Sequence, residues 1–162
     1  MGSHTKQPIT ALARFPPGYG TPQELLAWET VRAELESAKQ YWLSISGADT
    51  PPHVRPLDGL WLDERWFYGG SPETRHIQAV AASPQATLHL PDPWRAVIVE
   101  GVVEEIEPPQ DLVVRLIARS YEKYPEYGKP DPRHYTTVRY LRPRRAYAWT
   151  SFPTDATKFT FD

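Results

Sequence analysis

The sequence has no cysteine and a single methionine among its 162 residues. The absence of cysteine excludes disulfide bonds, thiolate metal ligands and cysteine nucleophiles. No apolar run approaches the roughly 20 residues that a membrane-spanning helix requires. The first residues, Met1-Gly2-Ser3-His4, lack the hydrophobic region of a signal peptide. We therefore expect a cytoplasmic protein that does not bind a membrane.

An excess of positive charge is also missing. The chain carries 18 Lys and Arg residues against 20 Asp and Glu residues, with a formal net charge of −2, which disfavours a nucleic-acid-binding protein. The histidines are scattered and form no H-E-x-x-H motif, so no zinc site is expected. There is no G-x-S-x-G motif and no P-loop. These absences leave the catalytic residues unassigned.

Proline and aromatic residues, in contrast, are abundant. Eighteen prolines predict many short elements with hard stops, which favours a β-rich fold over a helical bundle. Six Trp and nine Tyr residues could fill a core, line a ligand pocket or pack a subunit interface. The length suits one domain.

The order of the expected elements indicates the fold class. Residues 1–20 show no periodicity and are interpreted as an irregular N-terminal arm, followed by one domain over residues 21–162. Helices are expected from Thr21, from Ser71 and from Pro108. Strands are expected at residues 41–46, 53–57, 60–62, 66–68, 86–90, 95–106, 138–149 and 156–161. Helices do not alternate one-for-one with strands, so an antiparallel barrel fits better than a doubly wound parallel sheet.

A Gly-Gly turn that leads from a strand into a helix is the most informative segment. Backbone N–H groups at a helix N-terminus attract anions. Ser71 and Thr74 supply hydroxyl groups, Arg75 supplies a planar fork suited to phosphate, and His76 could add a donor. The alternative is an ordinary N-cap with a solvated arginine, and Glu73 in the same turn would repel an anion.

The segment His53–Leu57 could contact a flat ligand. On a strand, His53, Arg55 and Leu57 share one face, while Val54 and Pro56 point away. An arginine held on a rigid strand beside a barrel mouth could donate to the carbonyl edge of a ring. The alternative is a surface arginine paired with a carboxylate.

Two further groups have a similar ambiguity. Trp61, Trp66 and Tyr68 could stack on a flat cofactor or simply fill the core. A basic run near the C-terminal end could bind phosphate or a partner's acidic groups, or form a salt-bridged strand. The run consists of Arg139, Arg142, Arg144 and Arg145.

Several motifs occur in a specific order. They are Tyr41-Trp42-Leu43-Ser44, His53-Val54-Arg55-Pro56, Leu60-Trp61-Leu62-Asp63, Phe67-Tyr68-Gly69-Gly70, Thr74-Arg75-His76, Val99-Glu100-Gly101, the stretch Arg142–Trp149 and the stretch Ala156–Phe161. Over roughly residues 23–161 this series resembles the pyridoxamine 5'-phosphate oxidase-like superfamily, the FMN-binding split-barrel group that includes flavin and deazaflavin oxidoreductases.

The resemblance implies a mainly β (α+β) fold, a six-stranded antiparallel split β-barrel with flanking helices. It implies an obligate homodimer with two cofactor sites at the interface. It also implies an oxidoreductase that transfers a hydride between FMN or F420 and a small organic substrate. FMN is preferred, because nothing in the sequence accounts for the long tail of F420. The alternative is a non-catalytic cofactor- or haem-binding protein.

The resemblance also implies roles for particular residues. The cofactor-binding set would be Arg55, Pro56 and Leu57 along the ring system, Tyr68, Gly69 and Ser71 along the ribityl chain, Thr74, Arg75 and His76 at the phosphate, and Trp149 from the partner subunit. His76 stands where a lysine is common. Ser83-Pro84 replaces the frequent Asn-Pro, and the residues that bind substrate phosphate in pyridoxamine phosphate oxidases have no match, which disfavours vitamin B6 oxidation.

Overall fold

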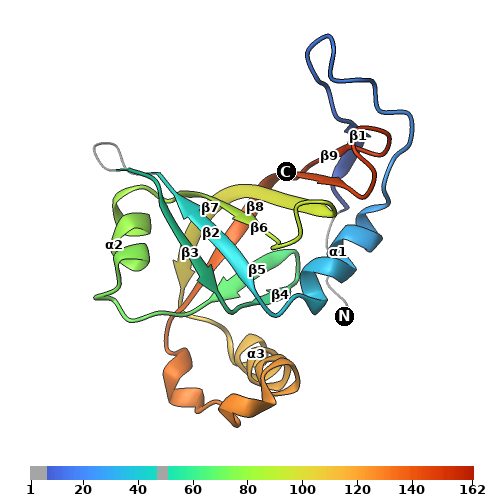
Figure 1. Cartoon of the computed structure of the whole chain (residues 1–162). Coiled ribbons are helices and arrows are strands. Elements are labelled where there is room, and N and C mark those ends of the chain that lie inside the picture. The colour runs from blue at the N-terminus through green and yellow to red at the C-terminus, as the bar shows by residue number, and fades with distance from the viewer. Residues whose placement is uncertain (1–6, 47–50) are drawn as a thin grey trace.

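The computed structural model describes residues 7–46 and 51–162, so most of the turn expected at residues 47–51 lies outside the described residues. The described chain forms an antiparallel sheet with three α-helices (Figure 1). The elements are β1 (Ile9–Leu12), α1 (Trp28–Ser37), β2 (Tyr41–Ile45), β3 (His53–Leu57), β4 (Leu60–Leu62), β5 (Arg65–Tyr68), α2 (Arg75–Ala82), β6 (Gln85–His89), β7 (Ala96–Ile106), α3 (Gln110–Lys123), η1 (Pro125–Tyr127), η2 (Pro132–Tyr135), β8 (Val138–Trp149) and β9 (Thr157–Thr160).

The strands follow the order β1-β9-β8-β7-β6-β2-β3, and β5 branches from β8 and carries β4. The mixed α+β class and the antiparallel pairing are therefore confirmed. The number of strands differs from the prediction, because the described sheet has nine strands instead of six. Within the described residues the two ends of this order, β1 and β3, are not paired with each other, so closure of a barrel is not seen.

The two longest strands, β7 and β8, change register at a bulge. Gly101 lies opposite Pro143, and the register shifts between Glu100 and Gly101. A Cβ atom at Gly101 would lie 2.2 Å from the Arg142 carbonyl oxygen, so only glycine fits this close approach. The interruptions expected at Gly101 and Pro143 are thus two sides of the same bulge.

The first helix begins later than the sequence indicates. Thr21 is not its N-cap, and α1 begins at Trp28. The N–H groups of Gln23 and Glu24 donate to the Thr154 carbonyl oxygen at 2.8 and 3.1 Å. This long-range contact holds the segment against the loop between β8 and β9, so it overrides the local capping signal.

Part of the N-terminal arm is also regular, contrary to the prediction. Ile9 lies opposite Thr160 and Leu12 lies opposite Thr157 in an antiparallel pair of β1 with β9. All four residues of β1 are exposed. Exposure on both faces explains why no apolar alternation marks this strand in the sequence.

The core has two parts, on the two faces of β5. Trp66 and Tyr68 point into the larger part and stack with ring centroids 4.5 Å apart. Phe67 points the other way and packs with Leu116 of α3 in the smaller part. Trp61 is 2% exposed and also belongs to the larger part. The interpretation of Trp61, Trp66 and Tyr68 as core residues is therefore confirmed.

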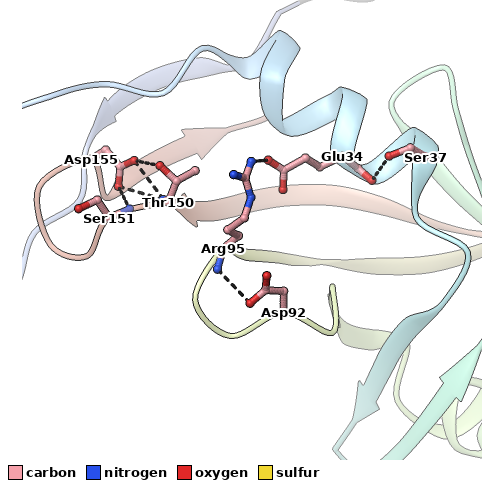
Figure 2. Close-up of polar contacts among 7 residues, drawn as sticks. All are labelled: Glu34, Ser37, Asp92, Arg95, Thr150, Ser151 and Asp155. Carbon is pink, nitrogen blue, oxygen red and sulfur yellow. Dashed lines mark hydrogen bonds and ion pairs between the residues drawn. The ribbon is translucent and has the colours of Figure 1, made fainter.

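The far end of β8 is held by a compact polar turn (Figure 2). The buried carboxylate of Asp155 accepts from the N–H groups of Thr150 and Ser151 at 3.0 and 2.9 Å, and from the Thr150 hydroxyl. Beside it, Arg95 forms an ion pair of 2.8 Å with Glu34, which ties the loop before β7 to α1. These contacts fix the backbone at the end of the sheet that carries Trp149.

Candidate functional site

The Gly-Gly turn joins β5 to α2 and places a helix N-terminus at one corner of the sheet. The helix begins at Arg75, not at Ser71, and Thr74 is its N-cap. The Ser71 carbonyl oxygen accepts from the Thr74 N–H at 2.9 Å and from the Thr74 hydroxyl at 2.7 Å. The first N–H groups of the helix, those of Arg75 and His76, have no intrahelical acceptor and carry the positive end of the helix dipole.

His76 lies beneath this helix start and is 7% exposed. Its Nε2 atom has no hydrogen-bond partner among the described residues. Gly70 has a φ of +153°, and a Cβ atom there would lie only 2.6 Å from this Nε2 atom. The turn therefore needs glycine at position 70 so that the imidazole can lie against the backbone. A Cβ atom at Gly69 would meet nothing within 4 Å.

A second buried histidine lies on the neighbouring strand. His53 of β3 is 9% exposed, and its Nε2 atom also has no partner among the described residues. Burial lowers the pKa of His53, and the charges of Arg75 and Arg55 and the nearby His76 lower it further. These four side chains, from β3 and α2, therefore form one electrostatic group, which we call the anion corner.

The strand register confirms which side chains of β3 face this corner. His53, Arg55 and Leu57 lie opposite residues of β2 that are fully buried, so these three side chains share the inner face. Pro56 lies on the outer face and does not reach the corner. Arg55 and Arg75 are exposed, and neither has a carboxylate partner within the described ranges. The salt-bridged alternative for Arg55 is therefore not seen.

Tyr68 of β5 and Arg139 of β8 lie beside the anion corner, close to His76. Tyr68 is 7% exposed, and its hydroxyl has no partner among the described residues. Burial raises the pKa of Tyr68, while Arg139 lowers it and Glu105 raises it. Tyr68 lies opposite Arg139 in the sheet, and Arg139 forms an ion pair with Glu105.

The remaining arginines of the basic run pair mainly with β7. Arg142 contacts Glu104 at 2.6 Å and Arg145 contacts Glu100 at 2.9 Å, so the salt-bridged interpretation of this run is confirmed for both. Arg144 is exposed at the bulge.

One residue of the predicted set lies far from the others in the same chain. Trp149 ends β8, a strand of 12 residues, whereas Arg139 lies next to its start. A strand of this length spans about 35–40 Å. Trp149 instead contacts Phe152, with ring centroids 5.4 Å apart. The structure thus places Arg55, Arg75 and His76 near His53, and the Tyr68 ring 6.4 Å from the His76 ring. It leaves Ser71 exposed in the turn and separates Trp149.

A cavity of about 660 Å³ adjoins the corner on the side of α3. Tyr68, Gly69 and Gly70 line it, and none of Arg55, Arg75 and His76 does. In the described part of the chain, no group of three or more His, Cys, Asp or Glu side chains could hold a metal ion. No helix of that part is long and apolar enough to cross a membrane.

We expect Gly70→Ala to disturb the anion corner and Gly69→Ala to leave it intact. The methyl group at position 70 would overlap the His76 ring and require a positive φ of an L-residue. The cost should be about 1–3 kcal/mol of unfolding free energy, measured by urea denaturation. Equal losses for the two variants would contradict the packing of His76 described above.

The stability should fall as the pH is lowered through the range in which histidine titrates. Burial lowers the pKa of His76 below its ordinary value near 6.5, and Arg139 and Arg55 lower it further against a hydrogen bond to the Gly69 backbone. The pKa of His53 is lowered in the same direction. The unfolded chain therefore binds more protons than the folded chain, so the free energy of unfolding decreases as the pH falls through about 6.5.

The pH effect can be isolated by comparing the protein with the double variant His53→Gln, His76→Gln. Urea denaturation at pH 8, 6.5 and 5 should show a smaller decrease for the variant, because other titrating groups are common to both proteins. Added phosphate should raise the free energy of unfolding more at pH 5 than at pH 8, since protonated imidazoles attract anions. A steeper decrease in the variant would show that these histidines are not buried in the neutral form.

Comparison with known proteins gives a fold but no sequence family. No protein-family model and no curated protein matches the chain. Solved structures do match. A haem-binding protein from Mycobacterium smegmatis has 18% identity and a TM-score of 0.59, covering 80% of this chain and 56% of its own. A protein from Listeria innocua assigned as a pyridoxamine 5'-phosphate oxidase has 16% identity and a TM-score of 0.57, covering 76% and 98%.

A third match is an F420 reductase, with 20% identity, a TM-score of 0.52 and coverage of 82% of this chain and 98% of its own. The structural neighbours are pyridoxamine 5'-phosphate oxidase-like split-barrel proteins. The chain therefore has the pyridoxamine 5'-phosphate oxidase-like split-barrel fold. Proteins that share this fold include an F420 reductase and a haem-binding protein, so the fold alone does not choose between these functions.

Proposed function

We propose that the protein is a flavin- or deazaflavin-dependent oxidoreductase that transfers a hydride between FMN or F420 and a small organic substrate. The observation that carries this proposal is the anion corner. Arg55 and Arg75 have no carboxylate partner among the described residues and lie near His53 and His76, whose Nε2 atoms have no partner there either. Buried polar atoms without partners indicate a missing ligand or water, and two arginines favour an anion such as a phosphate group.

The residues of the corner fit the parts of such a cofactor. Arg75, Thr74 and the first N–H groups of α2 would hold the phosphate. Tyr68 and Gly69 would flank the chain that follows, and Arg55 and Leu57 would lie along the ring. When bound, the cofactor supplies the hydride transfer, while the protein supplies orientation and electrostatics. The guanidinium of Arg55 would stabilise negative charge on the reduced ring.

We further propose that the active form is a homodimer. Trp149 lies at the opposite end of β8 from the corner of its own chain. It can therefore contact a cofactor only in a second copy. Its backbone is fixed by the turn around Asp155, which suits a residue that contacts another chain. Small-molecule substrate and cofactor would then meet where two copies join.

Absorbance titration of the purified protein with FMN, and separately with F420, tests the cofactor. We expect saturable binding of one of them, with FMN preferred. The bound cofactor should bleach with a reductant and recover when a suitable substrate is added. Absence of binding by both cofactors would overturn the proposal. Binding without recovery for any acceptor would indicate a carrier instead of an enzyme.

The second candidate is a haem-binding protein without turnover. The specific observation in its favour is that both buried histidines keep a free Nε2 atom, since imidazole is a common axial ligand of haem iron. A titration with haemin separates the candidates. A sharp Soret band that is lost in His76→Ala or His53→Ala, together with no FMN or F420 binding, would favour this second function.

A further inference from the structure

The cavity beside the anion corner is large enough for a second molecule. Its volume of about 660 Å³ lies between the end of β5, α3 and the η1–η2 segment. Tyr68, Gly69 and Gly70, at the end of β5 and in the turn before α2, line its edge nearest the corner. A ligand in this cavity would therefore lie next to a cofactor in the corner without occupying the phosphate site.

Aromatic side chains form part of the cavity walls. Tyr124 and Tyr127 stack with ring centroids 5.7 Å apart and an interplanar angle of 19°. The other aromatic side chains on its surface are Phe67, Tyr68 and Tyr135. The faces of such rings favour contact with a planar ligand.

The charges around the cavity disfavour an anion. Among the described residues that line it, Arg139 is the one arginine or lysine, and it is already paired with Glu105. Asp58 adds a negative charge and accepts a hydrogen bond of 2.9 Å from the Tyr127 hydroxyl. A phosphate or carboxylate would therefore find two carboxylates and no unpaired arginine.

The nearest lysine does not change this balance. Lys123 is absent from the cavity lining, and its Nζ atom donates to the Gly59 carbonyl oxygen at 3.0 Å and to the Tyr41 hydroxyl at 2.7 Å. Its pKa is lowered to about 8, mainly by burial. The ammonium group thus fastens the end of α3 to the turn after β3.

Tyr68, one of the lining residues, has a hydroxyl group without a partner in the described part of the chain. This hydroxyl is buried, and Tyr68 lines the edge of the cavity nearest the corner. An O–H group in this position can donate to a carbonyl or hydroxyl oxygen of a ligand. Leaving it unpaired has a free-energy cost that such a ligand would remove.

We infer that this cavity is the substrate site, and that it selects uncharged planar aromatic molecules whose oxygen atom binds the Tyr68 hydroxyl, while it rejects phosphorylated ones. The role as a substrate site rests on the proposed function. The selectivity for uncharged aromatic molecules rests only on the lining residues, so the two can fail separately.

Titration calorimetry with three probes tests the selectivity. The probes are 2-acetylnaphthalene, which is neutral, 2-naphthoate, which has the same rings with a carboxylate, and pyridoxine 5'-phosphate. We expect 2-acetylnaphthalene to bind at least tenfold more tightly than 2-naphthoate, and pyridoxine 5'-phosphate to bind most weakly. Tyr68→Phe should lower the affinity for the neutral ketone by about 3- to 10-fold, the effect of one hydrogen bond.

A matched pair of variants locates the binding. Thr136 and Thr137 are adjacent and exposed, but only Thr137 lines the cavity. Thr137→Trp should fill part of the cavity and lower the affinity for 2-acetylnaphthalene at least tenfold. Thr136→Trp should leave this affinity unchanged. Circular dichroism of both variants controls for folding.

The outcomes separate this inference from the proposed function. Absence of 2-acetylnaphthalene binding, tighter binding of either anion, or equal effects of the two tryptophan variants would overturn the inference. Binding of the ketone should not depend on Arg75, whereas FMN binding should. Ketone binding in a protein that binds neither FMN nor F420 would support the selectivity and overturn the redox role.

Discussion

Replacing Arg75 with alanine is expected to weaken FMN binding by about 10- to 150-fold. Arg75 is exposed at the start of α2, near enough to His53 to lower its pKa, and has no carboxylate partner among the described residues. A charge-assisted hydrogen bond to a phosphate contributes roughly 1.5–3 kcal/mol, which corresponds to that loss of affinity. Absorbance titration of both proteins gives the two dissociation constants.

Arg144→Ala is the matched control for this measurement. Arg144 is also exposed and lies at the bulge of β8, outside the anion corner. It should retain the affinity of the unmodified protein. If Arg144→Ala weakens binding and Arg75→Ala does not, the phosphate is bound by the basic run of β8, and the proposed site is wrong.

Replacing Trp66 with alanine is expected to lower the free energy of unfolding by about 3–5 kcal/mol, the usual cost of truncating a fully buried tryptophan. Trp66 has no exposed surface and packs between Tyr41 and Tyr68, with centroid distances of 5.2 and 4.5 Å. Its indole nitrogen also lies where a side chain at Gly59 would be. Guanidinium denaturation of the unmodified protein and the variant measures the loss.

Trp94→Ala provides the comparison, because the Trp94 side chain is 84% exposed. Its removal should change the stability by no more than about 0.5 kcal/mol. Similar losses for the two variants would mean that Trp66 is not the centre of the core. Since both variants lose the same chemical group, the difference reports burial alone.

The strands with clear boundaries in the sequence have the same boundaries in the structure. The expected strands 53–57, 60–62 and 138–149 correspond to β3, β4 and β8. The first two segments are bounded by glycine, proline or charged turn residues, so local chemistry determines their ends. The start of α1 could not be predicted in this way. The Thr154 carbonyl that holds the preceding segment is about 130 residues away in the sequence.

In the anion corner too, contacts between residues adjacent in the sequence could be predicted, whereas contacts that depend on tertiary packing could not. The Gly-Gly turn, Arg75 and His76 are adjacent in the sequence, so their association could be predicted from the motif. The sequence places His53 on the same face as Arg55, but it does not predict that the Nε2 atom lacks a partner, because that depends on how α2 packs on β3. Arg139 appeared only as part of the basic run, since its place opposite Tyr68 depends on the pairing of β5 with β8.

The pairing of β1 with β9 has a consequence for how copies of this chain could associate. It joins Ile9 and Thr160 across nearly the whole length of the chain, and all four residues of β1 are exposed. Closing so long a loop is costly in entropy, so this strand should be among the first to fray, with fast amide exchange at residues 9–12. When it detaches, the edge of β9 is left without hydrogen bonds. The same arm of another copy can then occupy that edge, which makes strand exchange a route to a swapped dimer.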